Sequence, residues 1–221
     1  MSKKAKGIVA VAASVVVIVT AVILITQFAS GSNVYEVGKT VRFGEWKWQV
    51  LDIQDGKALL ITKPIVEKRI YNEWTEVTWE TCTLRAYLNS EFLEKLSAEE
   101  QARICDTENV NLHNQWSGTS GGSSTTDKVF LLSIEEVVKY FGDSGQLKNK
   151  NPDSQYQIDD QYNGERVARF KSSRFWWWLR SPGFTEYYAA FVHPGGEVSL
   201  NGNFADYDGI GIRPALWLKI D

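Results

Sequence analysis

Cysteine and histidine are scarce in this chain of 221 residues, which has two of each. Cys82 and Cys105 cannot make a structural zinc site by themselves, because such a site needs four ligands, and His113 and His193 lack the spacing of zinc ligands. The two cysteines either form a disulfide that closes a loop of about 24 residues and contributes on the order of 3 kcal/mol, or remain two buried thiols. The sequence leaves both possibilities open and predicts no metal cofactor.

The sequence also lacks the short motifs that mark common enzyme sites. It contains no Gly-x-Ser-x-Gly nucleophile turn, no His-Glu-x-x-His metal motif and no phosphate-binding loop. Asp159 and Asp160 come nearest to a glycosidase pair, but adjacent residues on a polar loop rarely point toward the same substrate bond. We therefore expect a protein that is not an enzyme.

Charge is missing from one long apolar stretch near the N-terminus. Residues 7–28 carry no charged side chain, and as a helix they would span roughly 30 Å, the thickness of the hydrocarbon core of a bilayer. The alternative is a cleaved signal peptide, with small residues at Ala29-Ser30-Gly31, but the apolar core of a signal is usually only about 7–15 residues long. The stretch predicts a transmembrane anchor.

Acidic residues are absent before Glu36, whereas three lysines precede the apolar stretch. By the positive-inside rule, this asymmetry places residues 1–6 in the cytoplasm, 7–28 in the membrane, 29–40 in a short linker and 41–221 in an extracellular domain. Without those three lysines, 21 Lys and Arg face 27 Asp and Glu, a net charge of −6. Such an acidic exterior argues against nucleic acid as a partner.

The extracellular part begins and ends with patterns that predict strands. Residues 46–53 and 58–62 are two apolar segments on either side of Asp55-Gly56, which is a strong two-residue hairpin turn. The C-terminal part predicts a second group of strands, with a turn at Pro194-Gly195-Gly196. These later strands are expected at 175–180, 188–193, 197–200 and 210–220.

Helices are expected between the two groups of strands. Residues 83–104 read as helical, with a break at Asn89-Ser90. Ser-x-x-Glu capping boxes start helices after Ser97 and Ser133. Residues 129–132 are a short apolar run that predicts a buried strand. Strands, then two or three helices, then strands indicate an α+β domain with an antiparallel sheet.

Three consecutive tryptophans mark the C-terminal half of the chain. Because tryptophan buries a large area, we expect at least two of the three to lie in the core. Arg180 and Arg213 are expected to bond to backbone carbonyls or to a buried carboxylate rather than to a ligand. The residues predicted to frame this region are Trp176, Trp177, Trp178, Arg180, Pro182, Gly183, Gly211, Arg213 and Pro214.

Residues 183–209 lie between these framing residues and are rich in Tyr, Asn, Asp and Gly. Tyr and Asn supply stiff contact area and adaptable hydrogen bonds, and the combination suits a protein or a glycan ligand. Ordinary hairpin turns are the competing explanation, particularly for Asn201-Gly202 and Asp208-Gly209. The candidate ligand-binding residues are Tyr187, Tyr188, His193, Glu197, Asn201, Asn203, Asp206, Tyr207 and Asp208.

One tripeptide is similar to a calcium-binding element. Asn151-Pro152-Asp153 resembles the tripeptides that hold calcium in sugar-binding lectins, but the sequence has no Trp-Asn-Asp partner motif. Calcium needs about six to eight oxygen ligands, so a turn is the simpler interpretation. Asp206 and Asp208, with backbone carbonyls, could make a weak calcium site.

Four motifs in order resemble an uncharacterised family of bacterial domains of unknown function. Such domains are common in Firmicutes, often behind a signal or membrane anchor. The likeness covers residues 41–220, and the motifs are Thr83–Asn89, Asp127–Ser133, Trp177–Gly183 (Trp-Trp-Leu-Arg-Ser-Pro-Gly) and Gly211–Leu216 (Gly-Ile-Arg-Pro-Ala-Leu).

A looser resemblance concerns the fold. The arrangement is similar to the C-type-lectin-like fold of formylglycine-generating enzymes and of the variable proteins of diversity-generating retroelements. In those proteins a Gly-Phe-Arg closes the sheet, and Gly211-Ile212-Arg213 is its counterpart here. The formylglycine-generating enzymes use cysteines beside the C-terminal half of the fold, whereas Cys82 and Cys105 lie far upstream. The resemblance therefore implies the fold and not the oxidase activity.

Taken together, the sequence predicts a membrane-anchored extracellular domain that binds a protein or glycan through residues 183–209. Two other functions stay open. One is a passive structural module of the cell envelope, and the other is an enzyme that acts on envelope polymers. The enzyme would need a carboxyl group of raised pKa in a cleft, and the sequence does not identify one.

Overall fold

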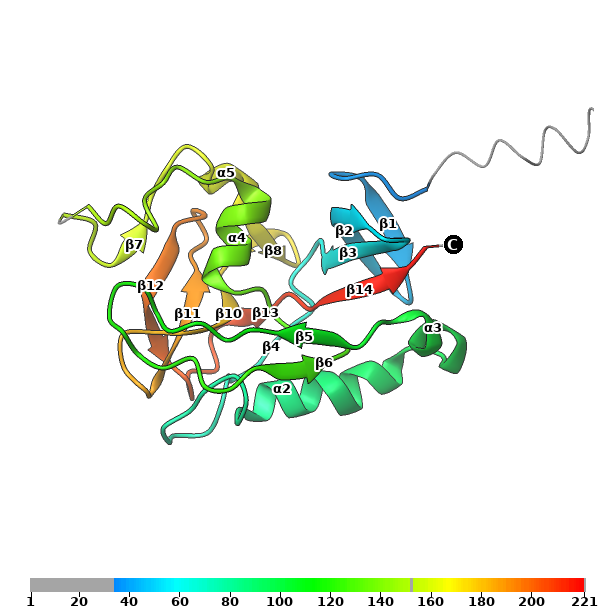
Figure 1. The fold of residues 1–221 in the computed structure, drawn as a ribbon, viewed down its shortest axis with the longest axis horizontal. Coiled ribbons are helices and arrows are strands. Elements are labelled where there is room, and N and C mark those ends of the chain that lie inside the picture. Colours follow the sequence, from blue (N-terminus) through cyan, green and yellow to red (C-terminus); the bar gives the residue numbers. More distant parts are fainter. Residues whose placement is uncertain (1–33, 152, 221) are drawn as a thin grey trace, which may run out of the picture. The chain divides into compact units, whose positions relative to one another are not determined.

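The computed structural model describes residues 34–151 and 153–220. The predicted cytoplasmic segment 1–6, the predicted anchor 7–28 and residues 29–33 of the predicted linker 29–40 lie outside these residues. Among the residues that are described, no helix combines the length and the apolar character needed to cross a membrane. Tyr35–Asp221 forms one unit, shown in Figure 1.

A four-stranded antiparallel sheet joins the two ends of this unit. Its order is β1-β2-β3-β14, so the last strand pairs with the third. The turn between β2 and β3 has positive φ at both Asp55 (49°) and Gly56 (69°), as a two-residue hairpin of type I′ requires. This confirms the predicted hairpin. The strands are β1 (Thr40–Phe43), β2 (Trp46–Gln54), β3 (Lys57–Thr62) and β14 (Ala215–Lys219).

A six-stranded sheet carries the C-terminal motifs (Figure 1). Its order is β4-β13-β10-β11-β12-β7, and every neighbouring pair is antiparallel except β10 and β13. All six residues of β10 are buried, because core elements cover both faces. The strands are β4 (Glu67–Lys68), β7 (Gln157–Ile158), β10 (Trp177–Pro182), β11 (Tyr188–Val192), β12 (Val198–Phe204) and β13 (Gly211–Ile212).

The predicted break at Asn89-Ser90 is wrong. The helical stretch continues as one coil from α2 through a π-helical turn and a 3₁₀ turn to Lys95 (Figure 1). The Asn89 side chain stabilises tertiary structure, since its amide donates to Val129 O and its oxygen accepts from the N–H groups of Lys128 and Val129. The elements are α2 (Thr83–Tyr87), the π turn (Leu88–Phe92) and the 3₁₀ turn (Leu93–Lys95).

Both predicted capping boxes are confirmed. Ser97 and Glu100 cap α3 (Ala98–Arg103), and Ser133 and Glu136 cap α4 (Ile134–Phe141). With α2 and the short α5 (Asn163–Arg166), the described residues contain four α-helices, more than the two or three expected.

The predicted strand at residues 129–132 is also wrong. All four residues are buried, but only Phe130 makes a β-bridge, to Ala215. An apolar run shows burial and does not by itself fix the backbone. Two short antiparallel pairs were not predicted, namely β5 (Thr107–Asn109) with β6 (Thr125–Asp127) and β8 (Ala168–Phe170) with β9 (Ser173–Phe175). The fold is a sheet-rich α+β arrangement, with the largest core cluster around β10 and β11.

The core contains two tryptophans and two arginines of the C-terminal motifs. Trp177 and Trp178 are completely buried, whereas Trp176 is 38% exposed. Arg180 forms a bidentate ion pair with Glu136 and donates to Leu131 O. Arg213 donates to Thr62 O and lies 4.7 Å from the centroid of the Trp177 ring, and burial lowers its pKa to about 9. Both arginines contact the protein interior rather than open solvent.

Candidate functional site

Three segments interlock at one end of the six-stranded sheet. Residues 71–81 lead into α2, residues 183–189 run from the end of β10 into β11, and residues 202–210 run from the last residues of β12 to β13. Backbone bonds tie them together, with Ala205 O accepting from the N–H groups of Tyr71 and Asn72, and the N–H of Ala205 donating to Tyr187 O. A fourth bond runs from the N–H of Val77 to Glu186 O.

Four aromatic side chains from these segments meet on the surface. Trp74 stacks on Tyr187 with ring centroids 5.3 Å apart and lies 5.2 Å from Phe204, which in turn meets Tyr188 edge-on at 4.6 Å. Trp74 is 60% exposed and Phe204 is 42% exposed. We call these four residues the aromatic face. Large exposed aromatics that pack on one another form a stiff apolar surface, which is what a binding face needs.

Two glycines permit the close approach of the strands beneath this face. A Cβ at Gly183 would lie 2.6 Å from Asn201 O, and one at Gly202, where φ is +75°, would lie 2.5 Å from Ala189 O. No side chain can replace either hydrogen without moving the backbone. Gly183 was predicted as a framing residue, and this contact is the physical reason.

A buried asparagine fixes the loops from below. The amide of Asn114 donates to three carbonyl oxygens, those of Pro182, Gly183 and Leu200, at 3.0, 3.1 and 2.8 Å. Its side-chain oxygen accepts from the N–H of Trp116. Asn114 is 2% exposed, so these bonds are shielded from water and hold the base of the loops rigidly.

A hollow of about 510 Å³ borders the aromatic face. Its lining includes the exposed carboxylates Glu76, Glu80 and Glu186 and no lysine or arginine. Glu76 accepts from the Tyr187 hydroxyl at 3.4 Å, which joins the hollow to the face, and Glu80 accepts from the N–H of Ser123 at 3.2 Å.

The acidity extends beyond the hollow. The three segments 71–81, 183–189 and 202–210 contain six Asp and Glu and no Lys or Arg. All six are exposed. The six are Glu73, Glu76, Glu80, Glu186, Asp206 and Asp208.

The structure brings only some of the predicted ligand-binding residues to this face. Tyr187 and Tyr188 belong to it, and Tyr207 lies next to it, with its N–H donating to Phe204 O. Asn203 precedes Phe204 on β12, and Asn201 is exposed further back on the same strand. Asp206 and Asp208 are exposed in the turn that follows.

His193 and Glu197 lie at the other end of the same strands. Because β11 runs from Tyr188 to Val192 at about 3.3 Å per residue, His193 is on the order of 15 Å from the aromatic face. The two residues flank the predicted Pro-Gly-Gly turn, where the N–H of His193 donates to Glu197 O. Burial lowers the pKa of His193, and the Glu197 carboxylate partly opposes this effect.

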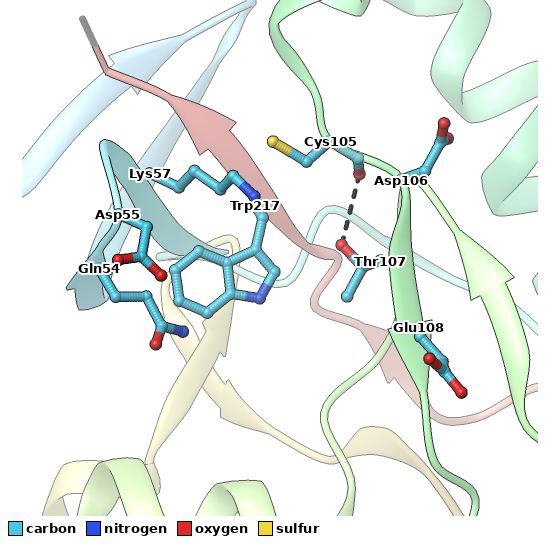
Figure 2. A pocket seen from close by; sticks show the side chains of 8 residues that line it. All are labelled: Gln54, Asp55, Lys57, Cys105, Asp106, Thr107, Glu108 and Trp217. Carbon is cyan, nitrogen blue, oxygen red and sulfur yellow. Dashed lines mark hydrogen bonds between the residues drawn. The ribbon is translucent and has the colours of Figure 1, made fainter.

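The two cysteines are buried, free thiols. Cys82 caps α2. Cys105 lines a second hollow, of about 290 Å³, between the β2–β3 turn, β14 and the start of β5 (Figure 2). Thr107 donates to Cys105 O there, and Lys57 and Trp217 complete the lining beside three carboxylates.

No group of three His, Cys, Asp or Glu side chains is placed to hold a metal among the described residues. Asn151 and Asp153 border a polar hollow of about 310 Å³ with Asp159, and Pro152 lies outside the described residues. The side-chain oxygen of Asn151 accepts from the N–H of Asp153, as in a turn.

Residues 55–220 match the family described as Domain of unknown function (DUF6273). The chain belongs to this family. No curated protein and no solved structure matches it. The DUF6273 domain thus includes the aromatic face, its acidic hollow and the strands that support them.

Trp74 of the aromatic face and Glu76 and Glu80 of the hollow lie outside the predicted region 183–209. Phe204 and Glu186 lie within that region but were not among the predicted ligand-binding residues. Trp74 and Tyr187 are more than a hundred positions apart, and only the folded chain shows that they stack. A weak signal was present, since an exposed loop that carries a Trp between two Glu residues has no local structural need for the ring.

Proposed function

We propose that this DUF6273 domain binds a protein or glycan ligand through its aromatic face and does not catalyse a reaction. The observation that supports this best is the stack of Trp74 on Tyr187 with Phe204 beside it, exposed to solvent and backed by a rigid base. Tryptophan and tyrosine are the side chains most often found at the centre of binding surfaces.

Two carboxyl groups, Asp160 and Glu100, are unsuited to act as a catalytic general acid, because the pKa of each is lowered. Burial by itself would raise the pKa of Asp160, but hydrogen bonds from Arg166, Ser144 and the N–H of Tyr162 lower it overall. Hydrogen bonds in the α3 capping box lower the pKa of Glu100. A catalytic general acid needs a pKa shifted in the opposite direction.

We further propose that the domain has a C-type-lectin-like fold and lies outside the cell, held by a membrane anchor at residues 7–28 with a cytoplasmic N-terminus. The charge-free run and the lysines before it support the anchor. A mixed sheet in which the β10–β11 and β12–β13 loops are hydrogen-bonded to each other supports the fold assignment. An exposed face on such a domain is accessible to partners in the cell envelope.

The test is a binding screen of the purified chain against glycans, peptidoglycan fragments and surface proteins, with calcium and again with chelator. A bound ligand should lose at least about 30-fold in affinity in Trp74→Ala, as at a hot spot worth roughly 2 kcal/mol. Trp176→Ala is the matched control, because Trp176 is also exposed and meets a different ring, Phe175, edge-on.

The melting temperature of Trp74→Ala should stay close to that of the wild type, because the ring is mostly exposed. A ligand that binds Trp74→Ala and the wild type equally would contradict the proposal. Affinity that depends on calcium would instead direct attention to Asn151 and Asp153.

A further inference from the structure

We infer that the ligand is a basic peptide segment of a partner protein, whose lysine and arginine side chains lie over the aromatic face and reach into the acidic hollow. This inference rests on the proposed function, because it uses the same face. It adds the chemistry of the ligand, which the aromatic rings alone do not specify.

The first argument is uncompensated charge. None of the six carboxylates at the face forms an ion pair with another described residue. Three of the six line one hollow, where like charges repel one another, and the folded domain bears that cost unless a cation joins them. A basic segment would remove the repulsion and gain charge-assisted hydrogen bonds.

The second argument is free hydrogen-bonding capacity at the hollow. Within the described part of the chain, Glu76 accepts one bond, from the Tyr187 hydroxyl at 3.4 Å, and Glu80 accepts one from the N–H of Ser123. The Glu186 side chain has no partner among the described residues. An ionised carboxylate has about four acceptor positions, so most positions at this hollow are available to an ammonium or guanidinium group.

The third argument is the aromatic rings themselves. Cations prefer the face of tryptophan above other rings, and the apolar stems of Lys and Arg pack well on aromatic surface. The chain makes such contacts elsewhere, with Arg69 3.5 Å from the Tyr87 centroid and Lys150 3.4 Å from the Tyr156 centroid. Among the described residues no Lys or Arg lies over Trp74, and the side chain is 60% exposed despite its stack on Tyr187, so a cation from outside can reach it.

Other ligand classes fit less well. A neutral glycan could stack on Trp74 and donate hydrogen bonds from its hydroxyls to the carboxylates, but it would leave their negative charge uncompensated. A nucleic acid would be repelled. A bare metal ion would find no group of three ligating side chains among the described residues. A peptide rich in Lys and Arg fits both parts of the surface. The apolar stems of these side chains can pack on the aromatic face, and their charged ends can reach the acidic hollow.

The test uses the purified full-length chain in mild detergent, with fluorescein-labelled octa-arginine and octa-glutamate as probes and fluorescence anisotropy as the readout. The variant Glu76→Gln/Glu80→Gln/Glu186→Gln removes three charges while it keeps side-chain size. Its matched control, Glu91→Gln/Glu94→Gln/Glu99→Gln, makes the same change in net charge at exposed positions in the π turn, the 3₁₀ turn and α3.

The wild type and the control variant should bind octa-arginine and not octa-glutamate. The site variant should bind octa-arginine at least about ten-fold more weakly, the loss expected from a few exposed charge pairs. Trp74→Ala should weaken it as well. Raising the ionic strength from about 0.01 M to about 0.15 M shortens the Debye length from roughly 30 Å to roughly 8 Å and should reduce affinity in the wild type most.

Equal losses in the site and control variants would show attraction by net charge alone and would overturn the inference, as would no binding of octa-arginine. The proposed function fails separately. If a glycan from the binding screen depends on Trp74 while octa-arginine does not bind, the aromatic face is a binding site and its ligand is not a basic peptide. If no ligand depends on Trp74, both proposals fail.

Discussion

The two cysteine sulfurs have different surroundings. The Cys82 thiol accepts from the N–H of Arg85 and donates to Trp79 O, and burial raises its pKa to about 12. Cys105 borders an open hollow, although little of its own surface is exposed (Figure 2). Because the thiolate is the reactive form, burial and a raised pKa both protect Cys82.

We therefore predict that iodoacetamide at about pH 8 labels Cys105 at least about ten-fold faster than Cys82 in the native chain. Peptide mass spectrometry of timed samples measures both rates, and labelling in urea should make them equal. Similar native rates would show that the hollow gives Cys105 no access. A reducing agent should leave the melting temperature unchanged, because the two thiols are not joined.

At the scale of single elements, the same local signal can have two different roles. Ser-x-x-Glu correctly predicts the start of both α3 and α4, because capping depends on residues three positions apart. The additional role of Glu136 could not be predicted, since its partner Arg180 is more than forty positions away. For the same reason Asn89, which bonds to the chain near Val129, was mistaken for a helix break.

Glu136→Gln should therefore destabilise the domain far more than Glu100→Gln. Both variants lose the carboxylate of a capping box, a change worth about 0.3–1 kcal/mol. Glu136→Gln also leaves Arg180, which is 4% exposed, without its counter-charge, and an uncompensated buried charge costs on the order of 3 kcal/mol. Urea denaturation of the two variants gives the comparison, and equal losses would show that the ion pair adds nothing beyond the cap.

At the scale of the whole molecule, long-range pairing limits what the sequence reveals. The Asp55-Gly56 turn predicts the hairpin, but nothing local indicates that β14 completes that sheet or that the C-terminal strands belong to a second one. The candidate site follows the same rule. The sequence predicts Tyr187 and Tyr188 as site residues. It does not predict Trp74, because Trp74 joins the site only through the packing of residues 71–81 against residues 202–210.

The response of the whole domain to acid follows from groups whose pKa the fold lowers. Burial lowers the pKa of His193, and hydrogen bonds lower that of Asp160 despite burial. A group with a lowered pKa binds its proton less well in the folded chain than in the unfolded chain. The unfolded chain then carries more protons, so the free energy of unfolding falls as the pH falls. His193 contributes below about pH 6.5 and Asp160 below about pH 4, their ordinary values.

Between about pH 7.5 and about pH 5.5 the shift at His193 should be the larger of these two contributions. His193→Gln should accordingly lose less stability over this range than the wild type, because the variant has no ring whose protonation the fold resists. His113→Gln is the matched control and should behave as the wild type, since His113 is exposed. Urea denaturation at both pH values measures the difference. A wild-type slope that persists in His193→Gln but disappears in His113→Gln would place the proton uptake at the exposed ring and remove the β11–β12 turn from the acid response.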